Sequence, residues 1–325
     1  MTRRAICLGL VTIALIQAVN GSSRAQDNYP SRPIKMIVSY AAGGTTDIMA
    51  RVTAQKMSEI LGQPIVIENK PGAGTIIAAE AAANSPADGY TLLMTATTTL
   101  SVNPATYKKL PYKVEDFAPI SLIGKMAYTF GVSNTVPVGN LKEFVEYTKA
   151  RPGQLNYGTV GLGGSTHIFT KLVEGTLGVQ MQDVIYKGSP PALTDLFAGT
   201  IQVYADGVIS SLPFYQDKKM KILAVSSEER LAAAPEIPTF VELGYPSVVL
   251  YSYYGVLAPA KTPPAIVAKL NAAMVKALAM PDLQERIKQN GAVPESTTPE
   301  GFGKLIADYL KAYGDIARPL NFNLE

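Results

Sequence analysis

The chain has little of what metal centres and disulfides need. Its 325 residues include one cysteine, one histidine and no tryptophan. A zinc site takes several histidine or cysteine ligands, and a disulfide takes two cysteines. Cys7 lies in a segment that we expect to be removed, and His167 stands alone. We therefore predict no metal site, no disulfide and no cofactor.

The sequence also lacks the common catalytic motifs. It has no G-x-S-x-G elbow, and Ser165 lies only two residues from His167, a spacing that does not aim a base at a nucleophile. Gly72-Ala73-Gly74 and Gly161-Leu162-Gly163 begin like dinucleotide fingerprints, but each lacks the third glycine at the required place. We therefore predict that the protein is not an enzyme.

No apolar run is long enough for a membrane span. The longest, from Ala5 to Val19, falls short of the roughly 18–20 residues that a span needs. Arg3 and Arg4 precede it and Ser23-Arg24-Ala25 follows it, which predicts a secretory signal peptide (1–25) cleaved after Ala25. Cleavage takes the formal charge from +3 to about zero, which argues against nucleic acid as a partner. We expect a periplasmic protein of about 300 residues, enough for two domains.

One stretch, Ile34 to Arg51, organises the rest of the chain. The apolar run 34–38 is typical of a buried strand, and Gly43-Gly44 permits a sharp turn. The next three residues, 45–47, are good helix N-cap types. The unpaired N–H groups and the dipole at such a helix start favour an anion. From these residues alone, an anion site and a purely structural turn both stay open.

Strands and helices alternate along the remainder, which predicts parallel βαβ units in an α/β sheet. In such sheets ligands bind beyond the carboxyl ends of the strands. The expected strands are 64–68, 91–95, 127–132, 155–159, 184–186, 201–205 and 221–225, with a strand-like crossing at 248–257. The expected helices are 75–84, 141–150, one ending near 175, one ending near 199, 264–279, 282–289 and 299–312.

A series of short motifs, in order and at fitting spacing, resembles the Bug family, the solute-binding proteins of tripartite tricarboxylate transporters. The resemblance covers nearly the whole chain after the signal peptide. It is carried by Tyr29-Pro30-Ser31-Arg32-Pro33, Gly43-Gly44-Thr45-Thr46-Asp47, Glu68-Asn69-Lys70-Pro71-Gly72-Ala73-Gly74, Ala87-Asp88-Gly89-Tyr90, Leu110-Pro111-Tyr112, Tyr157-Gly158, Tyr186-Lys187-Gly188, Pro238-Thr239, Glu242-Leu243-Gly244 and Ala258-Pro259.

The resemblance implies a type II periplasmic-binding-protein fold, with two α/β lobes joined by crossing strands and a ligand cleft between them. We expect lobe one to hold 26–126 and 248–325, and lobe two to hold 127–247. The implied ligand is a small carboxylate, held by two glycine loops at about 41–46 and 161–167. We expect replacement of Gly164 by Val to weaken binding with little change in the fold.

The candidate ligand-binding residues are of two kinds. Some belong to the glycine loops, and others end neighbouring strands. They are Tyr40, Ala42, Gly43, Gly44, Thr45, Thr46, Thr97, Gly161, Gly163, Gly164, Ser165, Thr166, His167 and Asp206. Several have a structural alternative: Asp47 as an N-cap, His167 as a packed structural residue, Asp206 as a loop anchor, and Tyr40 as core packing. Lys187 either balances a second carboxylate or is solvated.

The resemblance also implies partners: a small carboxylate ligand and the membrane permease subunits of a tripartite tricarboxylate transporter. We expect the binding protein itself to be a monomer. A di- or tricarboxylate or an aromatic carboxylate would suit, whereas an amino acid would need an acidic partner, for which Asp206 is the best candidate. The alternative function is a periplasmic sensor that presents its ligand-bound form to a signalling receptor.

Overall fold

Strands and helices alternate in the three-dimensional structure as the sequence predicts. The structure is a computed structural model that describes residues 28–289, 291–320 and 324. The predicted signal peptide lies outside these residues. Within them, every helix is too short or too polar to pass through a bilayer.

A first sheet is built around three parallel strands. β1 (Ile34–Val38) lies between β2 (Ile65–Asn69) and β3 (Thr91–Ala96), and it is parallel to both. The apolar side chains of β1 are fully buried, which is why this run forms a central strand. The connections are α2 (Thr45–Leu61), the short η1 (Ala73–Thr75) and α3 (Ile76–Ala83). After β3 come a π-helical turn η2 (Thr98–Val102), α4 (Asn103–Thr106) and η3 (Val114–Asp116).

A second sheet repeats this arrangement. β5 (Asn156–Val160) is parallel to β6 (Gln182–Tyr186) and to β7 (Val203–Gly207). Each of these strands leads into a helix, so the carboxyl ends of the strands carry helix starts in both sheets. The helices are α5 (Leu141–Lys149), α6 (Ser165–Leu177), α7 (Ser189–Ala198) and α8 (Val208–Gln216), and β8 (Met220–Val225) follows α8.

One long strand, β4 (Phe117–Ser133), belongs to both sheets. It pairs antiparallel with β9 (Tyr251–Pro259) up to Ala127 and with β7 and β8 from Tyr128 onward. The strand expected at 127–132 is therefore only the second part of β4. The sequence analysis did not predict the first part, which contains Pro119, and proline is rare inside strands. In the structure the register of the β4–β9 pairing shifts just after Pro119. The return crossing begins at Tyr251, after η4 (Pro246–Val248).

The C-terminal segment packs mainly on the first sheet. It comprises α9 (Pro264–Leu278), α10 (Pro281–Gln289), β10 (Ala292–Pro294), α11 (Pro299–Ala317) and η5 (Arg318–Leu320). α11 also reaches the second sheet, because Tyr313 and Ala317 form a buried cluster with Val102 and Ile168. The Tyr313 hydroxyl lies 3.1 Å from that of Tyr128 on β4.

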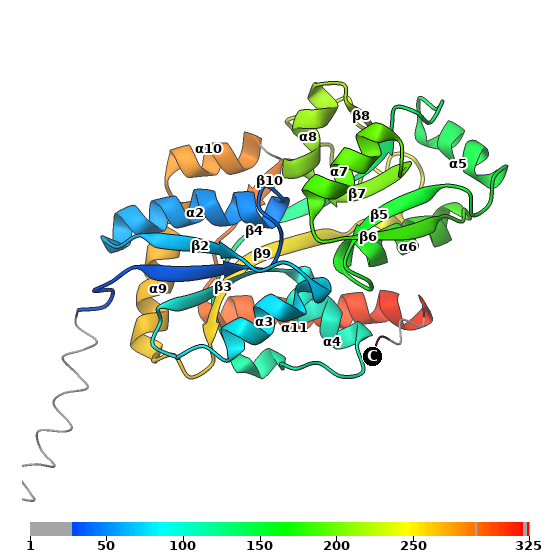
Figure 1. Ribbon diagram of the computed structural model, residues 1–325. Coiled ribbons are helices and arrows are strands. Elements are labelled where there is room, and N and C mark those ends of the chain that lie inside the picture. Colours follow the sequence, from blue (N-terminus) through cyan, green and yellow to red (C-terminus); the bar gives the residue numbers. More distant parts are fainter. Residues whose placement is uncertain (1–27, 290, 321–323, 325) are drawn as a thin grey trace, which may run out of the picture.

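The two sheets lie at opposite ends of the molecule, with β4 and β9 running between them (Figure 1). Elements from the first third of the chain and from its C-terminal part make one end, and the middle of the chain makes the other. The largest buried apolar cluster includes residues of both ends. The start of α2 thus faces the starts of α6, α7 and α8. The proposed division of the chain into lobes at 126/127 and 247/248 stays a prediction.

Candidate functional site

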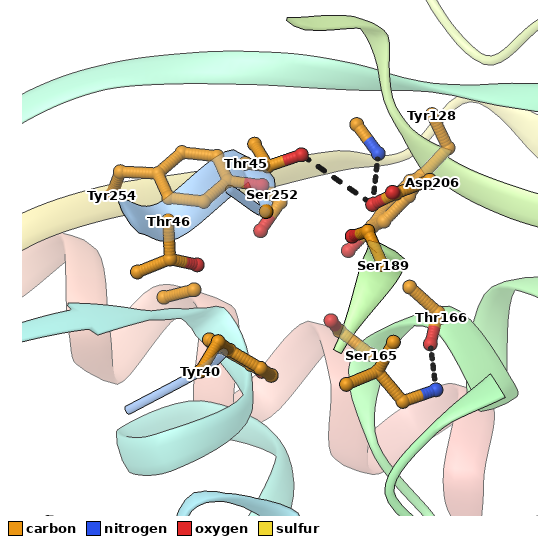
Figure 2. Close-up of a pocket in the computed structure, with 14 residues that line it drawn as sticks. Tyr40, Thr45, Thr46, Tyr128, Ser165, Thr166, Ser189, Asp206, Ser252 and Tyr254 are labelled. Carbon is orange, nitrogen blue, oxygen red and sulfur yellow. Dashed lines mark hydrogen bonds between the residues drawn. The ribbon is translucent and has the colours of Figure 1, made fainter. Parts of the chain in front are cut away.

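A cavity lies where these helix starts meet. It has an empty volume of about 390 Å³, which includes the open space at its mouth. Its lining is buried apart from the half-buried Tyr40. The lining residues are Tyr40, Gly44, Thr45, Thr46, Ala96, Tyr128, Val160, Ser165, Thr166, Ser189, Asp206, Gly207, Ser252 and Tyr254. We call this space the inner cavity; Figure 2 shows its lining.

The two glycine loops have the same backbone design. Gly43 and Gly163 have φ values of 80° and 65°, a region that glycine adopts without strain. The glycine that follows each of them is the N-cap of a helix, with φ/ψ of −83°/170° at Gly44 and −71°/173° at Gly164. In each loop the N–H of the first glycine donates a hydrogen bond to the side chain of the residue four positions later. Asp47 does so for Gly43 at 2.9 Å, and His167 does so for Gly163 through Nδ1, also at 2.9 Å.

Asp47 supports the first loop without being its N-cap, which is Gly44. Its carboxylate also accepts hydrogen bonds from Arg51 Nε at 2.8 Å and from Asn69 Nδ2 at 2.8 Å. Burial would raise the pKa of Asp47, but the hydrogen bonds from Arg51, Gly43 and Asn69 outweigh it and lower the pKa. Asp47 is therefore an ionised loop support at neutral pH.

The second loop is tied to both sheets. Thr166 Oγ1 accepts a hydrogen bond from Val160 N at 3.1 Å, which closes the turn. Thr98, beyond the end of β3, donates to Ser165 Oγ at 3.0 Å and accepts from Ser165 N at 3.2 Å. Burial lowers the pKa of His167 to about 4, so the ring is neutral at pH 7. His167 supports the loop, and it is not part of the cavity lining.

Of the described residues that line the inner cavity, Asp206 is the one with a carboxyl, amino or guanidinium side chain. Its carboxylate accepts hydrogen bonds from Gly207 N at 2.7 Å and from Ser210 Oγ at 2.5 Å. Thr45 of the opposite sheet donates to Ser210 Oγ at 2.9 Å. The Thr45 hydroxyl also points toward Asp206, at 3.5 Å from its carboxylate (Figure 2). Burial raises the pKa of Asp206, although its hydrogen-bond donors oppose the shift.

The electrostatics of the inner cavity come from the backbone. Four helices, α2, α6, α7 and α8, begin at its wall, at Gly44, Gly164, Gly188 and Gly207. Each start is the positive end of a helix dipole, equivalent to roughly half an elementary charge, and a helix start also leaves N–H groups without partners inside the helix. Fewer of these groups are available at α7, where Pro190 and Pro191 have no N–H, and at α6, where Ser165 N already donates to Thr98. Among the described residues, no lysine or arginine lines the space. The cavity is therefore suited to a small anion with polar oxygens.

The structure brings together half of the residues predicted from the sequence. Seven of the predicted residues line the inner cavity: Tyr40, Gly44, Thr45, Thr46, Ser165, Thr166 and Asp206. Ala42 and Gly43 are exposed, and the Thr97 hydroxyl is held behind the wall by Ser252 and the Tyr253 N–H. Gly161 lines a neighbouring chamber, and Gly163, Gly164 and His167 build the loop beneath the wall. That the lining residues bind ligand stays a prediction.

Gly164→Val is not a clean test of binding. A Cβ on Gly164 would lie 2.7 Å from the carbonyl oxygen of Val160 and 3.2 Å from that of Gly161. Backbone atoms at this distance must move, so the substitution distorts the loop itself. The prediction that it weakens binding with little change in the overall fold stays untested, because a distorted loop would weaken binding by itself.

The sequence analysis did not predict four polar residues of the cavity wall as ligand contacts. Ser189 starts α7, and the sequence signal for it was the Lys187–Pro190 turn. Tyr128, Ser252 and Tyr254 come from the crossing strands β4 and β9. No local motif marks them, because their place at the cavity follows from the pairing of strands that are far apart in the sequence.

We expect Asp206→Asn to change how stability depends on pH. The folded-state pKa of Asp206 is raised, so between about pH 4 and that pKa the folded protein holds a proton that the unfolded chain has lost. The Asp206 contribution to the free energy of unfolding therefore falls as pH rises through this window, by about 1.4 kcal/mol for each pH unit that separates the folded and unfolded pKa values. The asparagine of the variant cannot ionise, so the variant should gain stability relative to wild type as pH rises.

Thermal melts of both proteins from pH 4 to 8 measure this difference. Asp217→Asn, at an exposed acid after α8, is the control for the same replacement of a carboxylate by an amide outside the cavity. A constant difference between Asp206→Asn and wild type would show that the buried carboxyl has no raised pKa.

Comparison with known proteins gives consistent matches over most of the chain. The family model described as "Tripartite tricarboxylate transporter family receptor" matches residues 49–322. Protein BugT of Bordetella pertussis is 34% identical over 320 residues, which covers 98% of each chain. The solved structure of the periplasmic binding protein BugD superposes with a TM-score of 0.88 at 31% identity, covering 91% of this chain and 100% of BugD. A protein of R. palustris solved with adipate gives a TM-score of 0.87 at 31% identity, covering 89% and 97%.

Proposed function

Because the chain belongs to the family of tripartite tricarboxylate transporter receptors, we propose that it captures a small carboxylate in the inner cavity and delivers it to the membrane subunits of such a transporter. Members of this family are periplasmic solute-binding proteins and not enzymes. The resemblance and the two-lobed α/β fold predicted from the sequence are thereby confirmed. We further propose that the protein is exported to the periplasm.

The observation that carries the proposal is the convergence of four helix starts on one buried cavity. A carboxylate there meets N–H and hydroxyl donors from both sheets, and charge-assisted hydrogen bonds of this kind contribute about 1.5–3 kcal/mol each. The donors are already arranged by Asp47, His167 and Thr166, so little ordering is required on binding. The adipate complex of a relative supports a carboxylate as the ligand class.

Binding should depend on the ligand's negative charge and only weakly on salt. A carboxylic acid that binds the wild type should bind about ten- to a hundredfold more tightly than its amide, because the amide lacks the charge that strengthens the hydrogen bonds. A buried site is screened little by ions, so affinity should change little between low and moderate salt.

A thermal-shift screen of a carboxylate panel, followed by calorimetry of the best acid and its amide, tests the proposal. A bound acid should raise the melting temperature by an amount that grows with the logarithm of the ratio of its concentration to its Kd. If none of the carboxylates stabilises the protein, or if acid and amide bind equally, a carboxylate-binding function is excluded.

A further inference from the structure

Asp206 places a carboxylate of the protein inside a cavity whose helix starts favour an anion. The residue is only 5% exposed, and it lines the inner cavity. The N–H of Gly207, at the start of α8, donates to Asp206 Oδ1 at 2.7 Å. One of the four helix starts therefore already serves an anion that belongs to the chain itself.

A carboxylate bound at the start of α2 would lie close to this side chain. Thr45 is the first residue of α2, and its hydroxyl oxygen is 3.5 Å from the Asp206 carboxylate (Figure 2). Among the described residues that line the cavity there is no lysine or arginine to neutralise a second negative charge. Like charges within about 4–6 Å of each other disfavour joint ionisation, and burial strengthens the effect. A bound carboxylate and an ionised Asp206 are therefore poorly compatible.

The hydrogen bonds around Asp206 can accept a proton without movement of a heavy atom. Ser210 Oγ lies 2.5 Å from Asp206 Oδ2 and 3.1 Å from the carbonyl oxygen of Gly207. When Asp206 is ionised, the Ser210 hydroxyl donates to Oδ2. When Oδ2 carries a proton, Asp206 donates to Ser210 Oγ, and the Ser210 hydroxyl turns to the Gly207 carbonyl while it still accepts from Thr45. Both protonation states are thus fully hydrogen-bonded.

Among the described residues, no other group that faces Asp206 changes its charge between pH 6 and 9. Burial raises the pKa of each phenol around it above the ordinary tyrosine value; these are Tyr40 after β1, Tyr128 on β4, Tyr204 on β7 and Tyr254 on β9. Hydrogen bonds lower the pKa of Asp47 on α2, and burial lowers the pKa of His167 on α6 to about 4. The starts of α7 and α8 meet Asp206 with Ser189 and with Ser210.

We propose that binding of a carboxylate in the inner cavity is accompanied by uptake of one proton from the solvent, which Asp206 holds on Oδ2 and donates to Ser210 Oγ. The inference rests on the proposed function. The ligand stays ionised and keeps its hydrogen bonds from the helix starts, so the cavity contains one negative charge and not two. The ligand carboxylate and Asp206 then titrate as a coupled pair.

This coupling gives affinity a defined dependence on pH. Burial already raises the pKa of Asp206, and a bound carboxylate raises it further. Between the pKa of the free protein and that of the complex, each unit of increasing pH should weaken binding by up to about tenfold, because the proton must first be taken from a more dilute supply. Below this window the side chain is protonated in both states, and affinity should not vary with pH.

Calorimetry from pH 6 to 9, in pairs of buffers with different ionisation enthalpies, counts the protons taken up. The probe is hexanedioate or, if it does not bind, the strongest acid of the thermal-shift panel. Wild type should take up about half to one proton for each acid bound in part of this range. Asp206→Asn should take up none, and its affinity should not vary with pH. Its uncharged amide can donate to Ser210 Oγ as the protonated carboxyl does, so at pH 9 it should bind the acid at least about threefold more tightly than wild type.

Asp217→Asn, at an exposed acid after α8, is the matched control and should take up protons as wild type does. The proposal is overturned if wild type binds the acid without proton uptake at every pH, or if Asp206→Asn takes up as many protons as wild type. Weaker binding by Asp206→Asn at every pH would also overturn it, because Asp206 would then accept a hydrogen bond from the ligand. In each of these cases the acid binds and the proposed function stands. If no carboxylate of the panel binds, both proposals fail.

Discussion

Gly44→Val should lower the affinity for a carboxylate by about a hundredfold or more while the protein still folds. Gly44 lines the inner cavity between the starts of α2 and α7, and a Cβ there would lie 3.4 Å from Ser189 Oγ and 3.5 Å from the Ala41 carbonyl oxygen. Its φ of −83° is open to any residue, so the backbone need not change. A valine would occupy the space of the ligand and cover the N–H groups of α2, and losing one or two charge-assisted hydrogen bonds accounts for the size of the effect.

Gly139→Val is the matched control. Gly139 also precedes a helix, α5, and a Cβ there would meet only the Glu143 carboxylate, at 3.5 Å. Calorimetry on both variants with the best acid of the panel gives the affinities, and circular dichroism reports the fold. If a well-folded Gly44→Val protein binds the acid as tightly as wild type, the carboxylate site does not lie at the start of α2.

Gly161→Ala should prevent full closure of the two sheets on the ligand. The ideal Cβ of residue 161 would lie 2.8 Å from the Cα of Gly74, which lies in η1 between β2 and α3 of the first sheet. Glycine at both positions lets the two backbones meet. We expect the methyl group to hold them apart and to lower carboxylate affinity about ten- to a hundredfold. In small-angle scattering, wild type should show a smaller radius of gyration with saturating ligand than without it, and the variant should not.

Gly161 also has a φ of +86°, so alanine is strained there whatever the space. Gly62→Ala separates the two effects, because Gly62 has a φ of +69° and no atom within 4 Å of its ideal Cβ. It should lose stability without losing affinity or closure. A Gly161→Ala protein that compacts on ligand binding as wild type does would mean that the Gly161–Gly74 approach is not needed for closure.

Local sequence was sufficient to predict the two glycine loops. The turn at Gly43 depends on nearest neighbours, as do the strand before it and the helix after it. The N-cap itself is Gly44 and not one of the predicted residues 45–47. The two loops, Gly43-Gly44-Thr45-Thr46-Asp47 and Gly163-Gly164-Ser165-Thr166-His167, could be predicted because their stabilising contact has the same short spacing in both. The residue four positions after the first glycine accepts that glycine's N–H, an interaction within one turn of helix.

Residue roles within the loops were harder to predict than the loops themselves. His167 and Asp47 have side chains that could bind a ligand, and only the observed hydrogen bonds show that each accepts the N–H of the first glycine in its loop. The same holds for Thr97, which supports β9 from behind the cavity wall. A hydrogen-bonding side chain at a strand end can face either way, and packing decides which.

The amino-acid sequence by itself determined the alternation of strands and helices, the glycine turns and the helix starts, because each depends on contacts within a few residues. Only the tertiary structure decided which helix starts face one another. Thr45 meets Ser210 across 165 residues of chain, and Ser252 and Tyr254 reach the cavity because β9 pairs with β4. The inner cavity is therefore a product of long-range strand pairing and of packing between two sheets, which no single stretch of sequence encodes.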